Sequence, residues 1–269
     1  MAQYDMDDLI AVMRRLRDPD TGCPWDLQQD FRSLVRHTLE EVYELVDAIE
    51  HGDSGQVRDE LGDYLFQAVF YAQIAEEDGL FSFGEVVSGI VGKLLRRHPH
   101  VFPQGTLESS RSAQLALDSS EIHEQWETIK DDDRRARELH SRLDDVPRAL
   151  PAMQRAEKLQ RRAARAGFDW NHWRGVVEKV QEEIEELTLA AEQGDASGCE
   201  EELGDLLFSC VNLARHLGVD AEVAMRGANA KFERRFRDME AELAARGLRP
   251  EDCDLATLDD LWEAAKQAH

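Results

Sequence analysis

The sequence contains two copies of one acidic pattern at a constant spacing. In each copy, two adjacent glutamates are followed three residues later by a third, and a Glu-x-x-Asp pair comes on the next apolar segment. The acids of the first copy are Glu40, Glu41, Glu44, Glu60 and Asp63, and each recurs 142 residues later, as Glu182, Glu183, Glu186, Glu202 and Asp205. An ungapped register across both motifs indicates a tandem duplication. The chain is therefore expected to fold into two related domains.

Each copy has the periodicity of helices rather than of strands. Apolar residues recur every three or four positions through both glutamate-rich segments, which is the spacing of a helix face that packs against a core. These residues are Leu39, Val42, Leu45, Val46 and Ile49 in the first copy, and Val177, Val180, Ile184, Leu187 and Ala191 in the second. A glycine follows each segment, Gly52 and Gly194, where a left-handed residue commonly ends a helix. We therefore predict an all-α protein, a tandem repeat of helical domains with bundle cores.

A segment of different composition separates the two copies. Residues 103–120 are rich in serine, with proline and glycine, which is typical of a linker, and a strongly charged stretch that predicts a short helix follows. Pro147 and Pro151 then precede a basic helix that is expected to run to about Arg165. The predicted organisation is an N-terminal domain at residues 1–103, a linker with a short charged helix at 104–146, and a C-terminal domain at 147–269.

The Glu-x-x-Asp pair lies on an unusually apolar helix. Glu60 and Asp63 are three residues apart and share one face. Most of the remaining circumference is covered by Leu61, Tyr64, Leu65, Phe66, Val69 and Phe70, so we expect this helix to be buried on nearly every side. Acids in such a place, facing the glutamates of a neighbouring helix, repel one another unless a cation offsets their desolvation and repulsion. Mg²⁺ does this, because it typically bridges protein carboxylates to substrate phosphates.

A solvated helix face is the alternative interpretation of a Glu-Glu-x-x-Glu motif in a chain with 56 acidic residues. The recurrence of the whole pattern in register favours a metal site. A di-iron centre would need a Glu-x-x-His pair on two helices, but His37 precedes Glu40 instead of following it. The expected ion is Mg²⁺, with Mn²⁺ as an alternative because both accept oxygen ligands.

The bulk composition argues against several other classes of protein. A formal net charge of −24 disfavours binding to a nucleic-acid backbone, which needs a cationic surface. No stretch approaches the roughly 18 consecutive apolar residues of a membrane span, and the N-terminus lacks the layout of a signal peptide. The four cysteines show no metal-binding spacing. We expect a cytoplasmic protein with no nucleic-acid or membrane partner.

The acidic pattern, together with several other motifs, resembles a known family. Glu-Glu-x-x-Glu followed by Glu-x-x-Asp after a helical hairpin is the signature of the MazG-type all-α nucleotide pyrophosphohydrolases. The likeness covers nearly the whole chain and includes RLRDPDTGCPWD at 15–26, LGDYLFQAVFYAQ at 61–73, RRHPHVF at 96–102, GFDW at 167–170 and KFERRF at 231–236.

The resemblance implies an activity and an assembly. The activity is magnesium-dependent hydrolysis of NTPs and dNTPs to the monophosphate and pyrophosphate, by attack of water at the α-phosphate. Broad base specificity and a house-cleaning role toward non-standard nucleotides are implied as well. The assembly is a homodimer whose helices complete four-helix bundles.

The resemblance also assigns residues position by position. The implied metal ligands of the second copy are Glu183, Glu186, Glu202 and Asp205, and those of a second site in the first copy are Glu41, Glu44, Glu60 and Asp63. The implied catalytic residues are Glu182, Glu183 and Lys179. Those implied to bind substrate are Lys179, Glu182, Glu201, Lys231, Arg235 and Trp262. A solvated helix face stays the alternative for Lys231 and Arg235, and burial in an amphipathic C-terminal helix for Trp262.

The two copies differ around their acids. Lys179 of the second copy is replaced in the first by His37, which is mostly neutral at neutral pH. Pro99 ends a helix that the second copy continues, and the first copy has no counterpart of the segment that carries Trp262 directly after it. We therefore predict that the second copy carries the main activity. A non-catalytic helical interaction module and a narrow-specificity nucleotide pyrophosphohydrolase are the alternative functions.

Overall fold

The structure is a computed structural model that describes residues 3–110, 122, 126, 128–129, 134 and 139–268. Within these residues the regular elements are helices, and no strand is present. They are α1 (Met6–Leu16), α2 (Pro24–Leu27), α3 (Val35–His51), α4 (Ser54–Glu77), α5 (Phe83–Arg97), α7 (Ala152–Arg165), α8 (Trp173–Gln193), α9 (Ala196–His216), α10 (Ala221–Ala245), the 3-10 turn η1 (Pro250–Asp252) and α11 (Leu255–Ala268). The prediction of an all-α protein is confirmed. None of the described helices is both long and apolar enough to cross a membrane.

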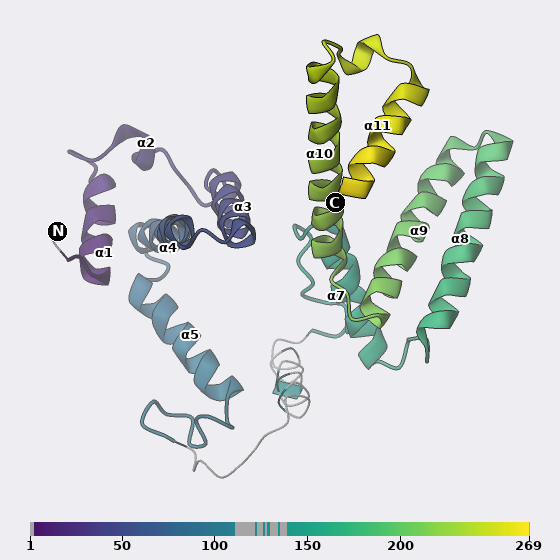
Figure 1. Cartoon of the computed structure of the whole chain (residues 1–269). Coiled ribbons are helices and arrows are strands. Elements are labelled where there is room, and N and C mark those ends of the chain that lie inside the picture. Colours follow the sequence, from purple (N-terminus) through teal and green to yellow (C-terminus); the bar gives the residue numbers. More distant parts are fainter. Residues whose placement is uncertain are drawn as a thin grey trace. The chain divides into compact units, whose positions relative to one another are not determined.

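The chain divides into two compact units, Met1–Asp132 and Asp133–His269, and Figure 1 shows the helices of each. The short charged helix predicted within 104–146 lies mostly outside the described residues. The basic helix predicted after Pro151 is confirmed as α7, which Pro151 precedes directly and which ends at Arg165.

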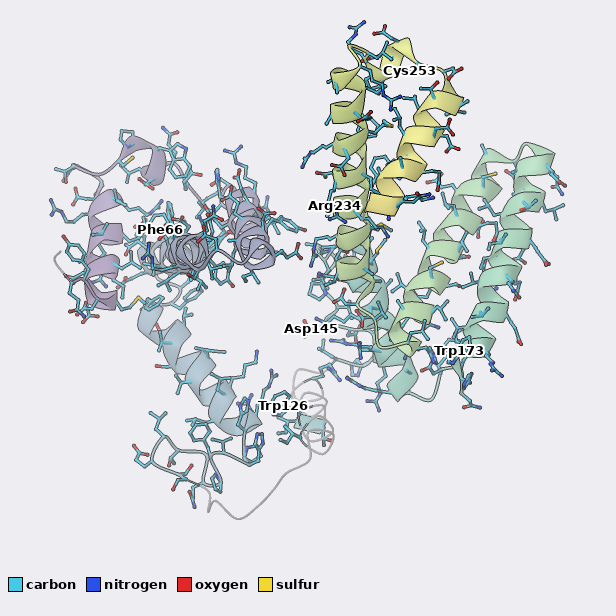
Figure 2. All side chains as sticks on the ribbon, in the orientation of Figure 1. Phe66, Trp126, Asp145, Trp173, Arg234 and Cys253 are labelled. Atoms are coloured by element: carbon cyan, nitrogen blue, oxygen red, sulfur yellow. The ribbon has the colours of Figure 1, made fainter. Side chains whose placement is uncertain are left out.

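In the first unit, α4 is the central helix. It packs against α3, α1 and α5. The buried core of this unit consists of Met13, Leu34, Val69, Phe70 and Ile74. Phe66 of α4, labelled in Figure 2, packs against this core. Arg17, the residue that follows α1, also pairs with Glu77 at the end of α4, with 2.7 Å between Nη2 and Oε2, which holds the two helices together.

The second unit is built from two helical hairpins and α7. Helices α8 and α9 form one hairpin, α10 and α11 form the other, and α7 contacts both α9 and α10 (Figure 1). The core between α10 and α11 consists of Met239, Leu243 and Leu261. Cys253, at the connection between these helices in Figure 2, packs against that core.

The two acid-bearing hairpins, α3–α4 and α8–α9, turn in the same way. Gly52 and Gly194 end the first helix of each in the left-handed conformation, with φ of 73° and 69°, as the sequence predicts. The following helix begins after Asp53 or Asp195. The side chain of Asp53 accepts hydrogen bonds from two backbone N–H groups of the first turn, and that of Asp195 accepts one. The duplication therefore extends to the turn chemistry that sets the geometry of both hairpins.

The expectation that α4 is buried on nearly every side is wrong for the chain by itself. Its exposed apolar residues are Leu61, Tyr64 and Leu65, with exposed fractions of 49%, 46% and 38%. The equivalent positions of α9 behave alike, since Leu203 and Leu207 are 47% and 49% exposed. The physical reason is that, among the residues that the structure describes, the helices packed against α4 and α9 leave the part of the surface with these side chains uncovered.

Candidate metal centre

The hairpin of α8 and α9 brings carboxylates of both helices together. Three acids, Glu183, Glu186 and Glu202, each have one oxygen within 4.8 Å of the others. In the hairpin of α3 and α4, Glu41, Glu60 and Asp63 meet the same condition. Carboxylates this close can share one hard divalent cation. The fold therefore forms the same kind of cluster twice.

Burial and mutual repulsion raise the pKa of acids in both clusters. For Glu202, burial is the largest cause, and the charges of the neighbouring acids, Glu186 first, add to it. Burial is also the largest cause for Glu41 and Glu60, followed by the carboxylates around them. A raised carboxyl pKa means that the negative form is disfavoured where it lies. The carboxylate oxygens are therefore suitable ligands for a divalent cation, and such an ion would also offset their mutual repulsion.

Two of the predicted ligands, Glu44 and Asp205, lie at the edge of these clusters. Among the described residues neither belongs to a group of three acids with oxygens within 4.8 Å, and both are exposed. Asp205 still adds to the raised pKa of Glu202, after burial and the nearer glutamates. Each hairpin thus gathers three of its four predicted ligands and keeps the fourth within electrostatic reach.

Lys179 distinguishes the second cluster from the first. Its Nζ lies 2.5 Å from Oε1 of Glu183 and 2.9 Å from Oε1 of Glu182, and Glu183 is only 2% exposed. The hydrogen bond to Glu183, followed by that to Glu182, raises the pKa of Lys179 above its ordinary value. In the first cluster, Nδ1 of His37 is 3.7 Å from Oε2 of Glu40. The charge of Lys179 therefore offsets that of the most buried acid of the second cluster, and the first cluster has a histidine at the equivalent position.

Of the other predicted substrate-binding residues, one lies beside the cluster and three lie on the α10–α11 hairpin of the second unit. Glu201 is exposed on α9 beside the cluster. Lys231 and Arg235 are one turn apart on α10, and Trp262 is half-buried on α11. Among the described residues, no hydrogen bond or ion pair joins Lys231 or Arg235 to the acids of α8 and α9. The chain by itself therefore brings Lys179 to the acids, and holds Lys231, Arg235 and Trp262 on a separate hairpin.

Two features of this unit escape the sequence prediction. Phe232 lies against Trp262, with 5.2 Å between ring centroids; its position one residue after Lys231 and four before Phe236 is the signal that could have identified it. Asp169 and Arg215 form an ion pair of 2.5 Å although they are 46 residues apart. No local pattern predicts a contact at that separation.

The model of the MazG nucleotide pyrophosphohydrolase domain matches residues 29–102 and 174–239, just over half of the chain. The chain belongs to the MazG family. In this MazG chain the two matched stretches contain the acids of both hairpins, so the family's domain coincides with the two carboxylate clusters.

Three curated relatives match almost the whole MazG chain. It is 50% identical over 264 residues to the nucleoside triphosphate pyrophosphohydrolase of Escherichia coli K12, a match that covers 97% of each protein. It is 41% identical over 260 residues to the nucleoside triphosphate pyrophosphohydrolase/pyrophosphatase MazG of Thermotoga maritima, covering 97% of this chain and 95% of the relative. A nucleoside triphosphate pyrophosphohydrolase of Mycolicibacterium smegmatis is 32% identical over 267 residues, covering 96% and 68%. The resemblance found in the sequence is confirmed.

Proposed function

We propose that this chain is a nucleoside triphosphate pyrophosphohydrolase, which converts NTPs and dNTPs to the monophosphate and pyrophosphate by attack of water at the α-phosphate. The observation that carries the proposal is the α8–α9 cluster, in which three carboxylates can share one cation and Lys179 reaches the most buried of them. The names of the relatives in Escherichia coli and Thermotoga maritima support it. Broad base specificity and house-cleaning of non-standard nucleotides belong to the proposal.

The proposed metal ligands of the second copy are Glu183, Glu186, Glu202 and Asp205. Mg²⁺, or Mn²⁺ in its place, supplies positive charge for the polyphosphate and lowers the pKa of a water molecule when bound. Glu182 is exposed next to Glu183, and we assign it the role of orienting the attacking water and accepting its proton.

Lys179 is the proposed first contact for the phosphates. Its side chain is one-third exposed, so it can exchange a Glu183 oxygen for a phosphate oxygen without a change in the backbone. Lys231 and Arg235 would neutralise the rest of the triphosphate. Trp262, supported by Phe232, would pack against the nucleotide. Glu201 would contact the substrate beside the cluster.

We propose a homodimer in which acid-bearing hairpins pair into four-helix bundles. The support is the apolar face of α9, where Leu203 and Leu207, one turn apart, are 47% and 49% exposed. Full burial of an exposed leucine is worth about 1.5–3 kcal/mol. Because these side chains are already about half-buried, a second hairpin on this face would supply about half of that for each. The exposed face of α4 supports the same pairing in the first unit.

In this proposal the first copy, at residues 1–103, binds metal through Glu41, Glu44, Glu60 and Asp63 but hydrolyses less. Its histidine next to the cluster is a weaker counter-charge than a lysine. Residues 104–146 act as the linker, and residues 147–269 form the main catalytic domain. We further propose that the protein works in the cytoplasm on free nucleotides, without a nucleic-acid or membrane partner.

Separate measurement of pyrophosphate and orthophosphate tests the activity. The full chain is incubated with Mg²⁺ and a panel of NTPs and dNTPs. We expect equal amounts of monophosphate and pyrophosphate from every base. Release of orthophosphate would refute attack at the α-phosphate. A single active substrate would indicate a narrow-specificity enzyme, and no turnover with any of them would indicate a non-catalytic interaction module.

A further inference from the structure

A cavity of about 330 Å³ opens beside the C-terminal half of α9. Its volume lies at the lower end of the roughly 300–1,000 Å³ range of ligand pockets. Three aromatic side chains line it, Phe168 and Trp170 from the loop before α8 and Phe208 from α9. At 1.5 Å of rise per residue, Phe208 in its wall lies about 9 Å along α9 from Glu202, and no acid of the carboxylate cluster lines the cavity. The cavity is therefore a neighbour of the carboxylate cluster with a lining of its own.

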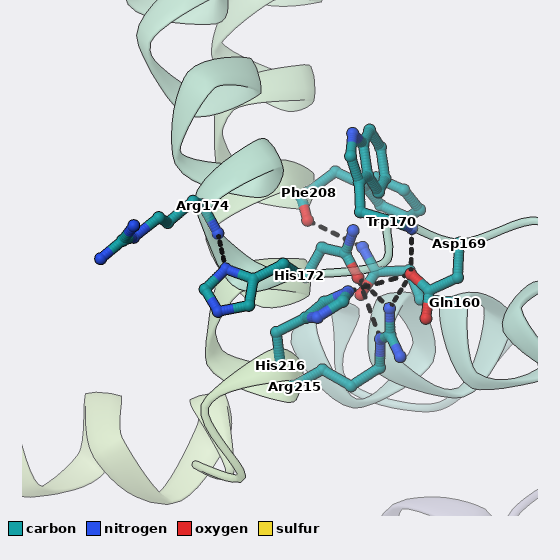
Figure 3. Close-up of polar contacts among 9 residues, drawn as sticks. Gln160, Asp169, Trp170, His172, Arg174, Phe208, Arg215 and His216 are labelled. Carbon is teal, nitrogen blue, oxygen red and sulfur yellow. Dashed lines mark hydrogen bonds and ion pairs between the residues drawn. The ribbon is translucent and has the colours of Figure 1, made fainter.

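The polar wall of the cavity is a fixed network, shown in Figure 3. Arg215 donates hydrogen bonds to Oδ1 of Asp169 at 2.5 Å and, through Nε, to Oδ1 of Asn212 at 2.9 Å. Nε2 of His216 lies 2.9 Å from the same oxygen of Asp169. Burial by itself would raise the pKa of Asp169, but the hydrogen bonds from Arg215 and His216 hold it below its ordinary value. The carboxylate therefore stays charged beside the aromatic walls.

The aromatic wall is also held in place. A Cβ atom at position 175 would lie only 2.8 Å from Cδ1 of Trp170, so the glycine at this position is what allows the indole to sit against the start of α8. Phe168, in contrast, is 79% exposed and forms an open edge of the cavity. A flat ring could thus enter past Phe168 and stack against a fixed surface.

Two hydrogen-bond acceptors in the cavity wall have no donor. Gln160 is 6% exposed; its Nε2 donates to the carbonyl of Phe208 at 2.8 Å (Figure 3), but its buried Oε1 has no hydrogen-bond partner. Among the described residues, the hydrogen bonds to the side chain of Asp169 all go to Oδ1, which leaves Oδ2 without a donor. A buried acceptor without a donor costs about 1–3 kcal/mol, so Oε1 of Gln160 calls for a ligand that brings an N–H group. The side chain of Asp169 is 24% exposed, so its Oδ2 can accept a second hydrogen bond from the same ligand.

We propose that this cavity is a second ligand site, which binds a nucleobase with an exocyclic amino group, as a free base or a nucleoside without phosphates. The aromatic side chains provide the stacking surface that any base accepts. The two acceptors without a protein donor favour a base whose edge donates hydrogen bonds. Carboxylates accept hydrogen bonds from the amino group of cytosine in this way. Arg215, the cation of the lining, is already bound to Asp169 and Asn212, so the site offers a phosphate no free positive charge.

Calorimetric titration of the full chain with cytidine and uridine, in EDTA and without triphosphate, tests the proposal. These nucleosides differ on one edge of the base: position 4 carries an amino group in cytidine and a carbonyl in uridine, and N3 carries a hydrogen only in uridine. We expect saturable binding of cytidine, about tenfold tighter than that of uridine, because at position 4 uridine brings a second acceptor to acceptors that need a donor. Phe168→Ala should weaken cytidine binding by about tenfold through loss of stacking, and Ala163→Phe should abolish it by filling the cavity.

Phe81→Ala is the matched control, since it removes a partly exposed phenylalanine from the other unit, outside the cavity, and it should leave cytidine binding unchanged. Circular dichroism verifies that each variant is folded. The proposal is overturned by the absence of saturable cytidine binding, by equal binding of uridine, or by binding that survives Ala163→Phe. It is equally overturned if cytidine is displaced when Mg²⁺ and a non-hydrolysable triphosphate saturate the chain, because the ligand then lies in the substrate site. Since the measurement is made without metal or turnover, its outcome is independent of the proposed activity.

Discussion

Replacement of Lys179 by methionine should tighten metal binding at the α8–α9 cluster and slow hydrolysis. The ammonium of Lys179 stands where a cation is needed, 2.5 Å from Glu183 and 2.9 Å from Glu182. A metal ion that takes the Glu183 oxygen must break this ion pair. Methionine keeps most of the length of the side chain and removes its charge, so the competition disappears. Hydrolysis slows because the proposed phosphate contact disappears as well.

The size of the effect follows from the exposure of the two partners. Exposed ion pairs are worth about 0–1 kcal/mol, and hydrogen bonds to charged groups about 1.5–3 kcal/mol. The side chain of Glu183 is 3% exposed and that of Lys179 is 33% exposed, so this pair lies between the two limits, at about 1–2 kcal/mol. Removal of the competitor should therefore increase the apparent metal affinity roughly five- to thirtyfold.

Calorimetric titration with Mn²⁺, without nucleotide, measures this affinity. A background with Glu60→Ala and Asp63→Ala removes the first cluster, so that only the second contributes. The control is Lys266→Met, which removes a Lys–Glu ion pair of the same 2.5 Å length on α11 and should leave Mn²⁺ affinity unchanged. If Lys179→Met binds Mn²⁺ no more tightly than its parent, the lysine does not compete with the metal and the reasoning is refuted.

Three further predictions concern the acids, the proposed dimer and the hairpin turn. Because the pKa of Glu202 is raised, by burial first and then by neighbouring acids, Mn²⁺ affinity should fall as the pH drops from neutrality toward the ordinary carboxyl value of 4.5. A Mn²⁺ affinity that calorimetry finds independent of pH would contradict the raised pKa of Glu202. In the same pH window Glu202 should make the metal-free fold less stable as the pH rises, since the folded form binds its proton more tightly than the unfolded chain does. Leu207→Glu should dissociate the dimer in sedimentation velocity, whereas Leu255→Glu, at a position 81% exposed, should not; an intact Leu207→Glu dimer would place the interface elsewhere. Gly194→Ala should lower the free energy of unfolding by about 1–2 kcal/mol, because φ there is +69°, and Gly227→Ala, inside α10 with no atom near its Cβ, should raise it by about 0.5–1 kcal/mol. Equal effects of the two glycine variants in denaturant titrations would contradict the role given to the turn.

The parts of the fold that depend on local sequence could be predicted. The apolar spacing of α3 and α8, the glycines that end them and the start of α7 after Pro151 each require only residues within one or two turns. The pairing of the two helices follows from the short connection between them. For this reason the acids of each hairpin could be expected to meet, and Glu183, Glu186 and Glu202 do lie together.

The features that could not be predicted depend on contacts between distant residues or on what covers a surface. The pair of Asp169 and Arg215 joins the loop before α8 to the last turn of α9, and no period of the sequence relates these two positions. The exposure of Leu61 and Leu203 could not be predicted from their apolar character, because an apolar helix face has the same sequence whether a core or a second chain covers it.

The contact of Lys179 with Glu183, in contrast, could have been predicted from the sequence. The two residues are four positions apart on one helix, which places their side chains on the same face.

The most direct test of the central claim, that the α8–α9 acids hold the catalytic metal, compares two single variants. Glu183→Gln and Glu41→Gln remove equivalent charges from the second and first clusters and preserve the shape of the side chain. Steady-state release of pyrophosphate from a nucleoside triphosphate is measured for both at saturating Mg²⁺, with folding verified by circular dichroism. We predict that Glu183→Gln loses at least about a hundredfold in kcat, a loss typical of removing one electrostatic group from a catalytic centre, while Glu41→Gln keeps most of the activity. A near-normal kcat for Glu183→Gln, or a collapse seen only in Glu41→Gln, would mean that the α8–α9 acids do not hold the catalytic metal.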